Sequence, residues 1–403
     1  MNHRDNRLCT IKEIKQHRPV LPDSPNCNTK DVAQPRGENH RLNPRISVKD
    51  VEDIAIGGAV LGTGGGGDPY IGKLMAQRAI EQYGEPEMIA LSDVPDDEFI
   101  MLAAGIGAPT VIIEKIFRGD EAVTVFEALE KYMGQKAYAI MSAEVGGLNG
   151  VIPIAVAARL GIPVVDADCM GRAFPEVQLV IPTLYGVSAT PMIIADEKGN
   201  SAILNTISNE WTESIARAIS SKMGGMALSA LFTMDGKTAK RATLDGMMTY
   251  CMKIGRTLRE ARQHKGEVLD ELLKVTGGVH LFKGKIIDLE RRTDRGHVRG
   301  IVSIQGSDQF RGQTASIDFQ NENLIARAGG EILATVPDLI TIVDQDTSYP
   351  VTTEGLKYGL RVNVIGIPCH KEWRTPAGIA LAGPHHFGYD VPFRPIQTME
   401  QPA

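Results

Sequence analysis

Apolar and polar positions alternate differently in the two halves of the chain. Helical spacing of apolar residues begins after Ser47 and again after Asp68, and each is a plausible helix N-cap. Further on, helical patterns take turns with short apolar runs typical of buried strands. Strands that alternate with helices predict an α/β N-terminal domain with a mainly parallel sheet, and we place it at residues 47–220.

The second half changes to a different pattern. It opens with helical material over 244–262 and 267–274, and short strand-like runs separated by turns follow from residue 286 to residue 367. We therefore expect a β-rich α+β C-terminal domain over 221–395. Residues 396–403 are expected to form a tail.

The first 46 residues form a third region. They are rich in proline, asparagine and basic residues, and their apolar residues are sparse and aperiodic. Such a segment buries little apolar surface, so we expect residues 1–46 to be a flexible extension. A targeting or partner-binding role for this extension is the alternative.

Composition and charge narrow the class of protein. The 403 residues carry 43 Lys and Arg against 49 Asp and Glu, which gives a net charge of −6 and argues against a nucleic-acid-binding protein. The five cysteines are scattered without a C-x-x-C pair, which fits a reducing compartment. No apolar run is long enough to span a membrane. We therefore expect a soluble, cytoplasmic protein without nucleic-acid or membrane partners.

A glycine-rich loop is the first candidate for chemistry. It follows a helical pattern rather than a strand, and no Gly-Lys-Ser/Thr follows it, so neither a dinucleotide fingerprint nor a P-loop is indicated. Its amide N–H groups would lie beside the positive end of a helix, where they can bind a carboxylate, a phosphate or a developing oxyanion. The alternative is a tight turn between helices. The predicted substrate-binding residues here are Thr63, Gly64, Gly65, Gly66, Gly67 and Asp68.

A second candidate lies where the apolar run 137–142 ends. Ligands of parallel sheets bind beyond the carboxyl ends of the strands, so Glu144 and Asn149 are expected to face a crevice and bind substrate. The alternative is that Asn149 only caps the helix that follows.

The third candidate is the segment 166–176, which also follows a buried strand. Asp166 and Asp168 would point the same way in an extended chain, and their mutual repulsion would raise one pKa, as suits a general base or a pair of metal ligands. Arg172 would hold a substrate carbonyl or carboxylate. We predict Asp166, Asp168 and Glu176 as catalytic residues. An ion-paired structural loop is the alternative.

Cysteine and histidine give weaker signals. Cys169 stands in the same segment and would be a nucleophile if its thiolate formed, although a lone cysteine in a loop is more often a bystander. His280, His370, His385 and His386 lie in the second half without the spacing of a metal site.

Together these segments resemble the S-methyl thiohydantoin desulfurase family. The resemblance is carried by GTGGGGDP at 62–69, by the segment 166–176, by TMDG at 233–236 and by FQNEN at 319–323, and it spans roughly residues 47–395. Further matching motifs are FKGK at 282–285, PDLI at 337–340 and FGYD at 387–390. One departure concerns Cys169, because the family is expected to have glycine there, which argues against a shared cysteine nucleophile.

The resemblance implies a hydrolase. Activated water would attack a ring carbon of a hydantoin-like or S-methyl thiohydantoin ring and expel a thiol. Asp166 or Asp168 would be the base, and the amides of Gly64–Gly67 would receive negative charge. A divalent metal held by these carboxylates and a late histidine stays open, and no nucleotide is expected.

The resemblance also suggests partners. It connects the chain to hydantoinase/oxoprolinase systems, so the alternatives are an accessory subunit of an ATP-dependent hydantoinase/oxoprolinase complex or a non-catalytic small-molecule binding module. We further expect a homo-oligomer.

Overall fold

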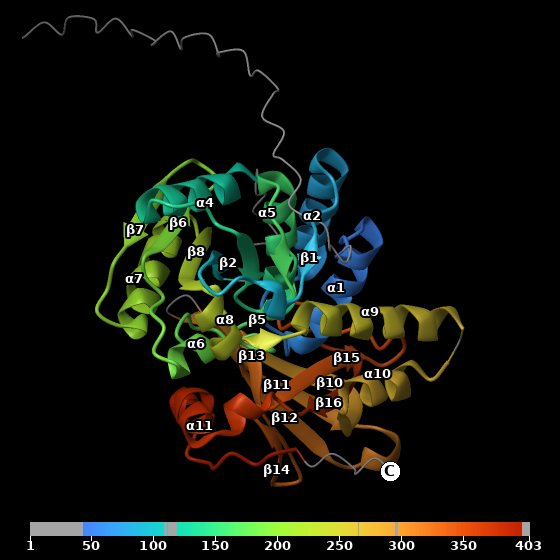
Figure 1. The fold of residues 1–403 in the computed structure, drawn as a ribbon. Coiled ribbons are helices and arrows are strands. Elements are labelled where there is room, and N and C mark those ends of the chain that lie inside the picture. The colour runs from blue at the N-terminus through green and yellow to red at the C-terminus, as the bar shows by residue number, and fades with distance from the viewer. Residues whose placement is uncertain (1–42, 109–110, 112–118, 265, 295–296, 397–403) are drawn as a thin grey trace, which may run out of the picture. The chain divides into compact units, whose positions relative to one another are not determined.

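The computed structural model describes residues 43–108, 111, 119–264, 266–294 and 297–396. These residues build two seven-stranded sheets (Figure 1). The larger apolar core contains residues of both sheets, and a smaller core is formed by residues of the second half. Most of the predicted N-terminal extension, residues 1–42, lies outside the described residues, as does 397–403 of the tail. The ends that are described are held in place: Ile46 is buried in the first core, and Ile396 is buried against the second.

The first sheet is mixed. Its strand order is β1-β4-β3-β2-β8-β6-β7; β1, β4, β3 and β2 pair in parallel, and β8, β6 and β7 join them in antiparallel fashion. The bounds are β1 Met88–Ile89, β2 Phe99–Gly107, β3 Ala139–Ser142, β4 Val164–Val165, β6 Met192–Ala195, β7 Ser201–Leu204 and β8 Met226–Asp235. The predicted α/β class is confirmed, with β8 inserted next to the parallel strands.

Helices join and cover these strands. Ser47 and Asp68 cap α1 and α2 through their side chains, as the sequence predicts, and Ser47 does so within a capping box. Ser208 caps α7 in the same way. The helices of this half are α1 Val48–Leu61, α2 Pro69–Tyr83, α4 Asp120–Met133, α5 Ile152–Leu160, α6 Ile181–Leu184, α7 Asn209–Lys222 and α8 Gly236–Ala242. The short 3₁₀ segments are Leu91–Asp93 and Gly147–Gly150.

The second sheet is antiparallel throughout, in the order β14-β13-β12-β11-β10-β16-β15. Its bounds are β10 Val279–Asp294, β11 His297–Gly306, β12 Thr314–Gln320, β13 Glu322–Ala328, β14 Glu331–Thr335, β15 Leu339–Asp344 and β16 Arg361–Ile367. The helices here are α9 Met247–Gln263, α10 Val268–Thr276 and α11 Pro376–Ala382, with 3₁₀ turns at Asp308–Phe310, Lys371–Arg374 and Pro384–Phe387. The predicted β-rich α+β half is confirmed.

Helix α9 connects the two layers. Figure 1 shows it, in yellow, between the blue and green first layer and the orange to red second sheet. It crosses α1 so closely that a Cβ atom on Gly57 would lie 2.0 Å from the Cys251 carbonyl oxygen, and one on Gly255 would lie 1.9 Å from the Asp53 carbonyl oxygen. Arg259 of α9 also binds the buried Asp53 carboxylate, at 2.8 Å. Glycine at both crossing points therefore permits the contact that joins the halves.

The expected division near residue 220 falls in the last turn of α7, shortly before β8. By pairing, β8 belongs to the first sheet, and the second sheet begins only at Val279. A two-stranded ribbon links the layers as well: β5 Ala167–Asp168 pairs with β9 Leu244–Asp245, which stands at the start of the predicted helix 244–262. No helix among the described residues is long and apolar enough to cross a membrane.

Candidate active site

The glycine-rich loop lies where the first and second halves meet. Thr63 and Gly64 accept backbone hydrogen bonds from Asn323 (2.8 Å) and Thr353 (2.7 Å), and both donors belong to the second half. A Cβ atom on Gly65 would lie 2.0 Å from Oε1 of Glu322, and Gly64, Gly66 and Gly67 all have positive φ. Backbone conformation and close packing together therefore require glycine here.

One amide of this loop already binds a carboxyl group of the protein itself. The N–H of Gly66 donates to Oε1 of Glu322 at 3.1 Å, and the Gly66 carbonyl accepts from the Leu148 N–H at 2.9 Å. Glu322 is the first residue of β13 and is 1% exposed. The predicted anion-binding geometry of the loop is thus used by a carboxyl group that lies 256 positions further along the chain.

Glu144 and Asn149 follow β3 and lie beside this loop. Asn149 accepts from the Gly105 N–H at 2.6 Å and donates through Nδ2 to Oε1 of Glu144 at 2.5 Å. Oε2 of Glu144 accepts from the Phe174 N–H at 3.2 Å. Asn149 lies in the 3₁₀ turn before α5, and its side chain does not cap that helix. It connects Glu144 to the backbone of strand β2 instead.

Glu144 and Glu322 line the same small cavity. Its volume is about 60 Å³, and Gly66, Asn149 and Arg217 also contribute to its wall. A second cavity of about 60 Å³ shares Glu144 and Asn149 and continues between apolar side chains such as Phe232. Gly105 at the carboxyl end of β2 borders both, as expected for ligand sites at the ends of parallel strands.

Burial raises the pKa of both glutamates. For Glu144 desolvation is the largest cause and raises the pKa from 4.5 to about 8, against the opposing hydrogen bonds from Asn149 and Phe174. For Glu322 desolvation, and next the charge of Glu144, raise the pKa well above its usual range, while Arg172 and the Gly66 N–H act in the opposite direction. Two carboxyl groups that repel each other across one cavity lose their protons in sequence, which suits acid–base chemistry.

Arg172 is fully buried behind this pair. Its guanidinium donates to the Pro337 carbonyl, to the Asp338 carbonyl at 3.2 Å and to the Thr63 hydroxyl at 3.2 Å. Its guanidinium carbon also lies 4.2 Å from the centre of the Phe174 ring. Burial lowers the pKa of Arg172 to about 10, and the charge of Glu322 is the first to oppose this. Arg172 therefore ties the loop to the second half and supplies positive charge near the cavity without lining it.

Asp166 and Asp168 do not converge as an extended segment would imply. Asp166 accepts hydrogen bonds from the Thr249 N–H (2.9 Å) and hydroxyl near the start of α9. Asp168, fully buried, accepts from the N–H groups of Val145 (3.0 Å) and Gly171 (2.8 Å). Burial raises the pKa of Asp168 to about 7 against these hydrogen bonds. Asp166 thus connects its segment to α9, and Asp168 connects it to the segment that follows β3. Neither residue lines the cavities.

Glu176 lies at the far end of the second cavity. Its Oε2 is 3.1 Å from Nε2 of His386 and accepts from Gln178 at 2.5 Å. Burial by itself would raise the pKa of Glu176, but the hydrogen bond and charge of His386 outweigh it, so the pKa is lowered. His386 thus reaches the wall of the site through Glu176, and His297 reaches it through the Pro175 carbonyl, 3.2 Å from its Nε2.

The remaining candidates lie away from the carboxyl pair. Cys169 is fully buried, and desolvation raises the pKa of its thiol well above 9.0, so the thiol is poorly suited as a nucleophile. Asp68 caps α2, accepting from the Tyr70 N–H at 2.8 Å, and borders a different, open hollow. Within the described ranges no three His, Cys, Asp or Glu side chains are grouped so that they could hold a metal ion.

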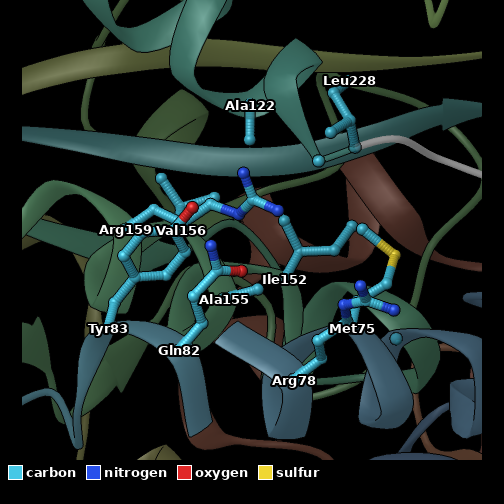
Figure 2. Close-up of a pocket in the computed structure, with 12 residues that line it drawn as sticks. Met75, Arg78, Gln82, Tyr83, Ala122, Ile152, Ala155, Val156, Arg159 and Leu228 are labelled. Atoms are coloured by element: carbon cyan, nitrogen blue, oxygen red, sulfur yellow. The ribbon is translucent and has the colours of Figure 1, made fainter. Parts of the chain in front are cut away.

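The larger hollows of the surface are not where the buried carboxyl groups lie. One of about 430 Å³ lies between α2 and α5 (Figure 2), and one of about 530 Å³ borders Asp68. Volume would favour these, yet no fully buried carboxyl group of the described residues lines either one. Because water activation needs titratable groups in the wall, we favour the small cavity that Glu144 and Glu322 share.

Comparison with known proteins agrees with this two-part layout. Residues 49–206 match the S-Me-THD-like N-terminal domain, and residues 207–396 match the S-Me-THD-like C-terminal domain. The chain therefore belongs to the S-Me-THD-like family, that of S-methyl thiohydantoin desulfurase. The family's name implies an enzyme.

A solved structure shares the fold. It is a crystal structure of a protein from Chromobacterium violaceum, with a TM-score of 0.71 and 22% sequence identity, and the match covers 87% of this chain and 99% of that one. At this identity the likeness concerns the fold alone. No curated protein matches the chain.

Glu322 was not among the residues predicted to form the site. In the sequence, the segment 319–323 stands out only by its family resemblance, because no local pattern marks Glu322 as catalytic. A signal did exist in its setting: a lone glutamate among residues that continue into the apolar run of β13. A charged residue in such a run is seldom buried without a partner or a task.

Proposed function

We propose that the chain is a hydrolase that replaces the methylthio group of an S-methyl thiohydantoin-type ring with oxygen and releases a thiol. The observation that carries this proposal is the pair of buried carboxyl groups, Glu144 from the first half and Glu322 from the second, that face one cavity. Family membership supports the substrate class.

The two glutamates are proposed to divide the proton transfers. Glu144 has the more modest rise in pKa, to about 8, and accepts two hydrogen bonds that favour its charged form, so it ionises first and serves as the base. Glu322 keeps its proton longer. Its Oε1 accepts from Gly66, and its Oε2 is buried without a hydrogen-bond partner among the described residues, so a proton on Oε2 is available to the substrate.

The proposed reaction balances as follows. The carboxylate of Glu144 takes one proton from water, and the oxygen attacks the ring carbon that bears the methylthio group. The carbon–sulfur bond breaks, and the departing sulfur takes a proton, so that the products are a ring carbonyl and methanethiol. The second proton of water ends on the adjacent ring nitrogen, and Glu322 gives its proton to the leaving sulfur. The proton that Glu144 took from water then passes to Glu322, which restores both carboxyl groups. Arg172 offsets negative charge near the pair during the attack.

The size of the site limits the substrate. Ligand pockets usually measure about 300–1,000 Å³, whereas each of the two adjoining cavities measures about 60 Å³. We infer that the substrate is compact, little more than the ring and its methylthio group, and that the apolar second cavity takes the methylthio end.

The test is thiol release from an S-methyl thiohydantoin, followed with a thiol-specific dye. The purified full chain is compared with Glu144→Gln, Glu322→Gln and, as a matched control, Glu81→Gln on the exposed face of α2. We expect release by the parent and the control, and losses of roughly 100-fold or more in the two cavity variants. A folded parent protein that releases no thiol, with or without added divalent metal, would count against the proposal and favour an accessory subunit or a binding module.

A further inference from the structure

Arg217 lies in the wall of both small cavities, and the proposed reaction gives it no task. It projects from α7, and its side chain is 11% exposed. The sequence predicts Arg172 as the residue that holds a substrate carbonyl, but Arg172 lines neither cavity. A different, largely buried arginine therefore occupies the position from which a substrate can be held.

Three hydrogen bonds fix the guanidinium of Arg217. Its Nε atom donates to Oε1 of Glu213 at 2.6 Å, one turn earlier on α7. Its Nη2 atom donates to the Pro175 carbonyl at 2.8 Å, and its Nη1 atom donates to the Gly107 carbonyl at 3.4 Å. A guanidinium held at all three nitrogens is preorganised, so little side-chain entropy is lost when a ligand binds to it.

Two N–H groups of this guanidinium remain available. Arginine has five N–H donors, one on Nε and two on each Nη atom. The three hydrogen bonds use one donor on each nitrogen, so one N–H on Nη1 and one on Nη2 have no acceptor among the described residues. Glu144 lines the same two cavities, and neither a hydrogen bond nor an ion pair joins it to Arg217. The proposed base and the two available donors therefore border a common space.

The charge of Arg217 is already balanced by its neighbour. Glu213 is 8% exposed, and its second oxygen accepts from the Val177 N–H at 2.9 Å, so its carboxyl group is held beside the guanidinium. An anionic ligand would have to be bound by a pair whose charges already compensate each other. A neutral carbonyl oxygen needs only N–H donors in a fixed direction. The position therefore favours a neutral carbonyl over a carboxylate.

We propose that Arg217 donates to the ring carbonyl of the substrate and determines which rings are accepted. This inference rests on the proposed function. In a hydantoin-like ring, the carbonyl carbon and the carbon that carries the methylthio group are bonded to the same ring nitrogen. A ring held at Arg217 by its carbonyl thus presents the neighbouring carbon to the water that Glu144 activates.

The same contact stabilises the charge that forms during the attack. When the water oxygen bonds to the ring carbon, the π electron pair of the carbon–nitrogen double bond moves to the ring nitrogen and is shared with the carbonyl oxygen. The charge disappears when the second proton of water reaches that nitrogen. Hydrogen bonds to a charged acceptor are stronger than those to a neutral one, so Arg217 binds the transition state more tightly than the substrate.

Binding of two rings that differ in this carbonyl tests the contact without turnover. Hydantoin has the carbonyl, and 2-imidazolidinone, the cyclic urea with the same ring size, lacks it. Both are neutral near neutral pH and are titrated into the full-length protein by calorimetry. We expect hydantoin to bind at least about tenfold more tightly, as for a hydrogen bond from a charged donor. Equal affinity for the two rings, or no binding of hydantoin, would overturn the proposal.

Two variants of Arg217 and a matched control locate the effect. Arg217→Gln should reduce the preference for hydantoin to about twofold or less and lower kcat for thiol release by roughly 100-fold, with a smaller change in KM. Arg217→Lys keeps the charge but has fewer donors, and its values should lie between those of the parent and of Arg217→Gln. The control is Arg327→Gln, which breaks an ion pair with Asp318 (2.9 Å) outside both cavities and should keep the preference and kcat of the parent.

The outcomes separate this inference from the proposed hydrolysis. A parent protein that prefers hydantoin but releases no thiol would refute the hydrolase and support Arg217 as the residue that binds the carbonyl. Thiol release with a parent-like preference and kcat in Arg217→Gln would refute the role of Arg217 alone. A lower kcat with an unchanged preference for hydantoin would show a structural role and refute it as well. Melting temperatures show whether each variant is folded, and if Arg217→Gln is not, Arg217→Lys and the two rings with the parent decide the matter.

Discussion

The substitution Glu144→Gln tests whether burial raises the pKa of this side chain. Glu144 is 6% exposed, and its surroundings raise its pKa from 4.5 to about 8. In the unfolded chain the group has its ordinary pKa. At a pH between these two pKa values, Glu144 therefore keeps its proton in the folded protein and has lost it in the unfolded chain.

The sign of the pH dependence follows from this difference. The contribution of Glu144 to stability is greatest below about pH 4.5 and falls as the pH rises toward 8, because the unfolded state gains more from ionisation of this group than the folded state does. At about 1.36 kcal/mol per pKa unit, the free energy of unfolding should fall by roughly 3–4 kcal/mol between pH 5 and pH 8 on account of Glu144 alone. Glutamine does not titrate, so Glu144→Gln should lack this contribution.

The substitution also has an effect that does not depend on pH. Asn149 and Phe174 donate to the two oxygens of Glu144, and glutamine would turn its NH₂ group toward one of these donors. A mismatch of this kind costs about 1–3 kcal/mol. The variant should thus be less stable than the parent near pH 5 and equal or more stable near pH 8.

Urea unfolding at pH 5, 6, 7 and 8 measures both effects. The informative quantity is the difference between parent and variant at each pH, because the contributions of titratable groups far from Glu144 largely cancel. Glu81→Gln, at an exposed position on α2, should give a difference that changes little with pH. A constant difference between the parent and Glu144→Gln across this range would refute the assignment of a raised pKa to Glu144.

Two further predictions concern the loop and the thiol. Gly65→Ala places a Cβ atom 2.0 Å from Oε1 of Glu322, so we expect a loss of roughly 1–3 kcal/mol in the free energy of unfolding and a clear loss of thiol release. The control is Gly355→Ala, whose Cβ atom would have its nearest contact at 3.4 Å. Melting and activity measurements should show neither loss in this control. Cys169→Ala should change the rate of thiol release by less than about twofold, because burial keeps this thiol protonated; a 100-fold loss would contradict that conclusion.

The sequence predicts elements well where caps and periodicity agree. Ser47 and Asp68 begin helices as expected, and the strand-like runs expected between residues 286 and 367 lie in strands of the second sheet. The sequence pattern does not predict strand β8 in the same way. Its apolar run at Met226–Asp235 lies in a segment whose neighbours are helical, and a buried strand without alternation cannot be told from helix by period. Only its pairing with β2 and β6 decides the matter.

The candidate site was predictable only in part. Glu144 and Asn149 stand at the carboxyl end of a strand, and this topological rule places them at the cavity. The same rule would place Asp166 and Asp168 at the cavity, but they bind backbone N–H groups of neighbouring segments instead. Glu322 required tertiary information, because its partner Gly66 is 256 positions away.

The glycine-rich loop and Glu322 are best understood together. A free amide at Gly66 would bind a substrate anion, but in this structure it binds Oε1 of Glu322, whose second oxygen is buried without a partner among the described residues. Burial disfavours the charged form of this carboxyl group, so the loop holds a protonated acid at a fixed position. On this reasoning the glycines position a proton donor opposite Glu144, and their role in charge stabilisation is exerted through Glu322.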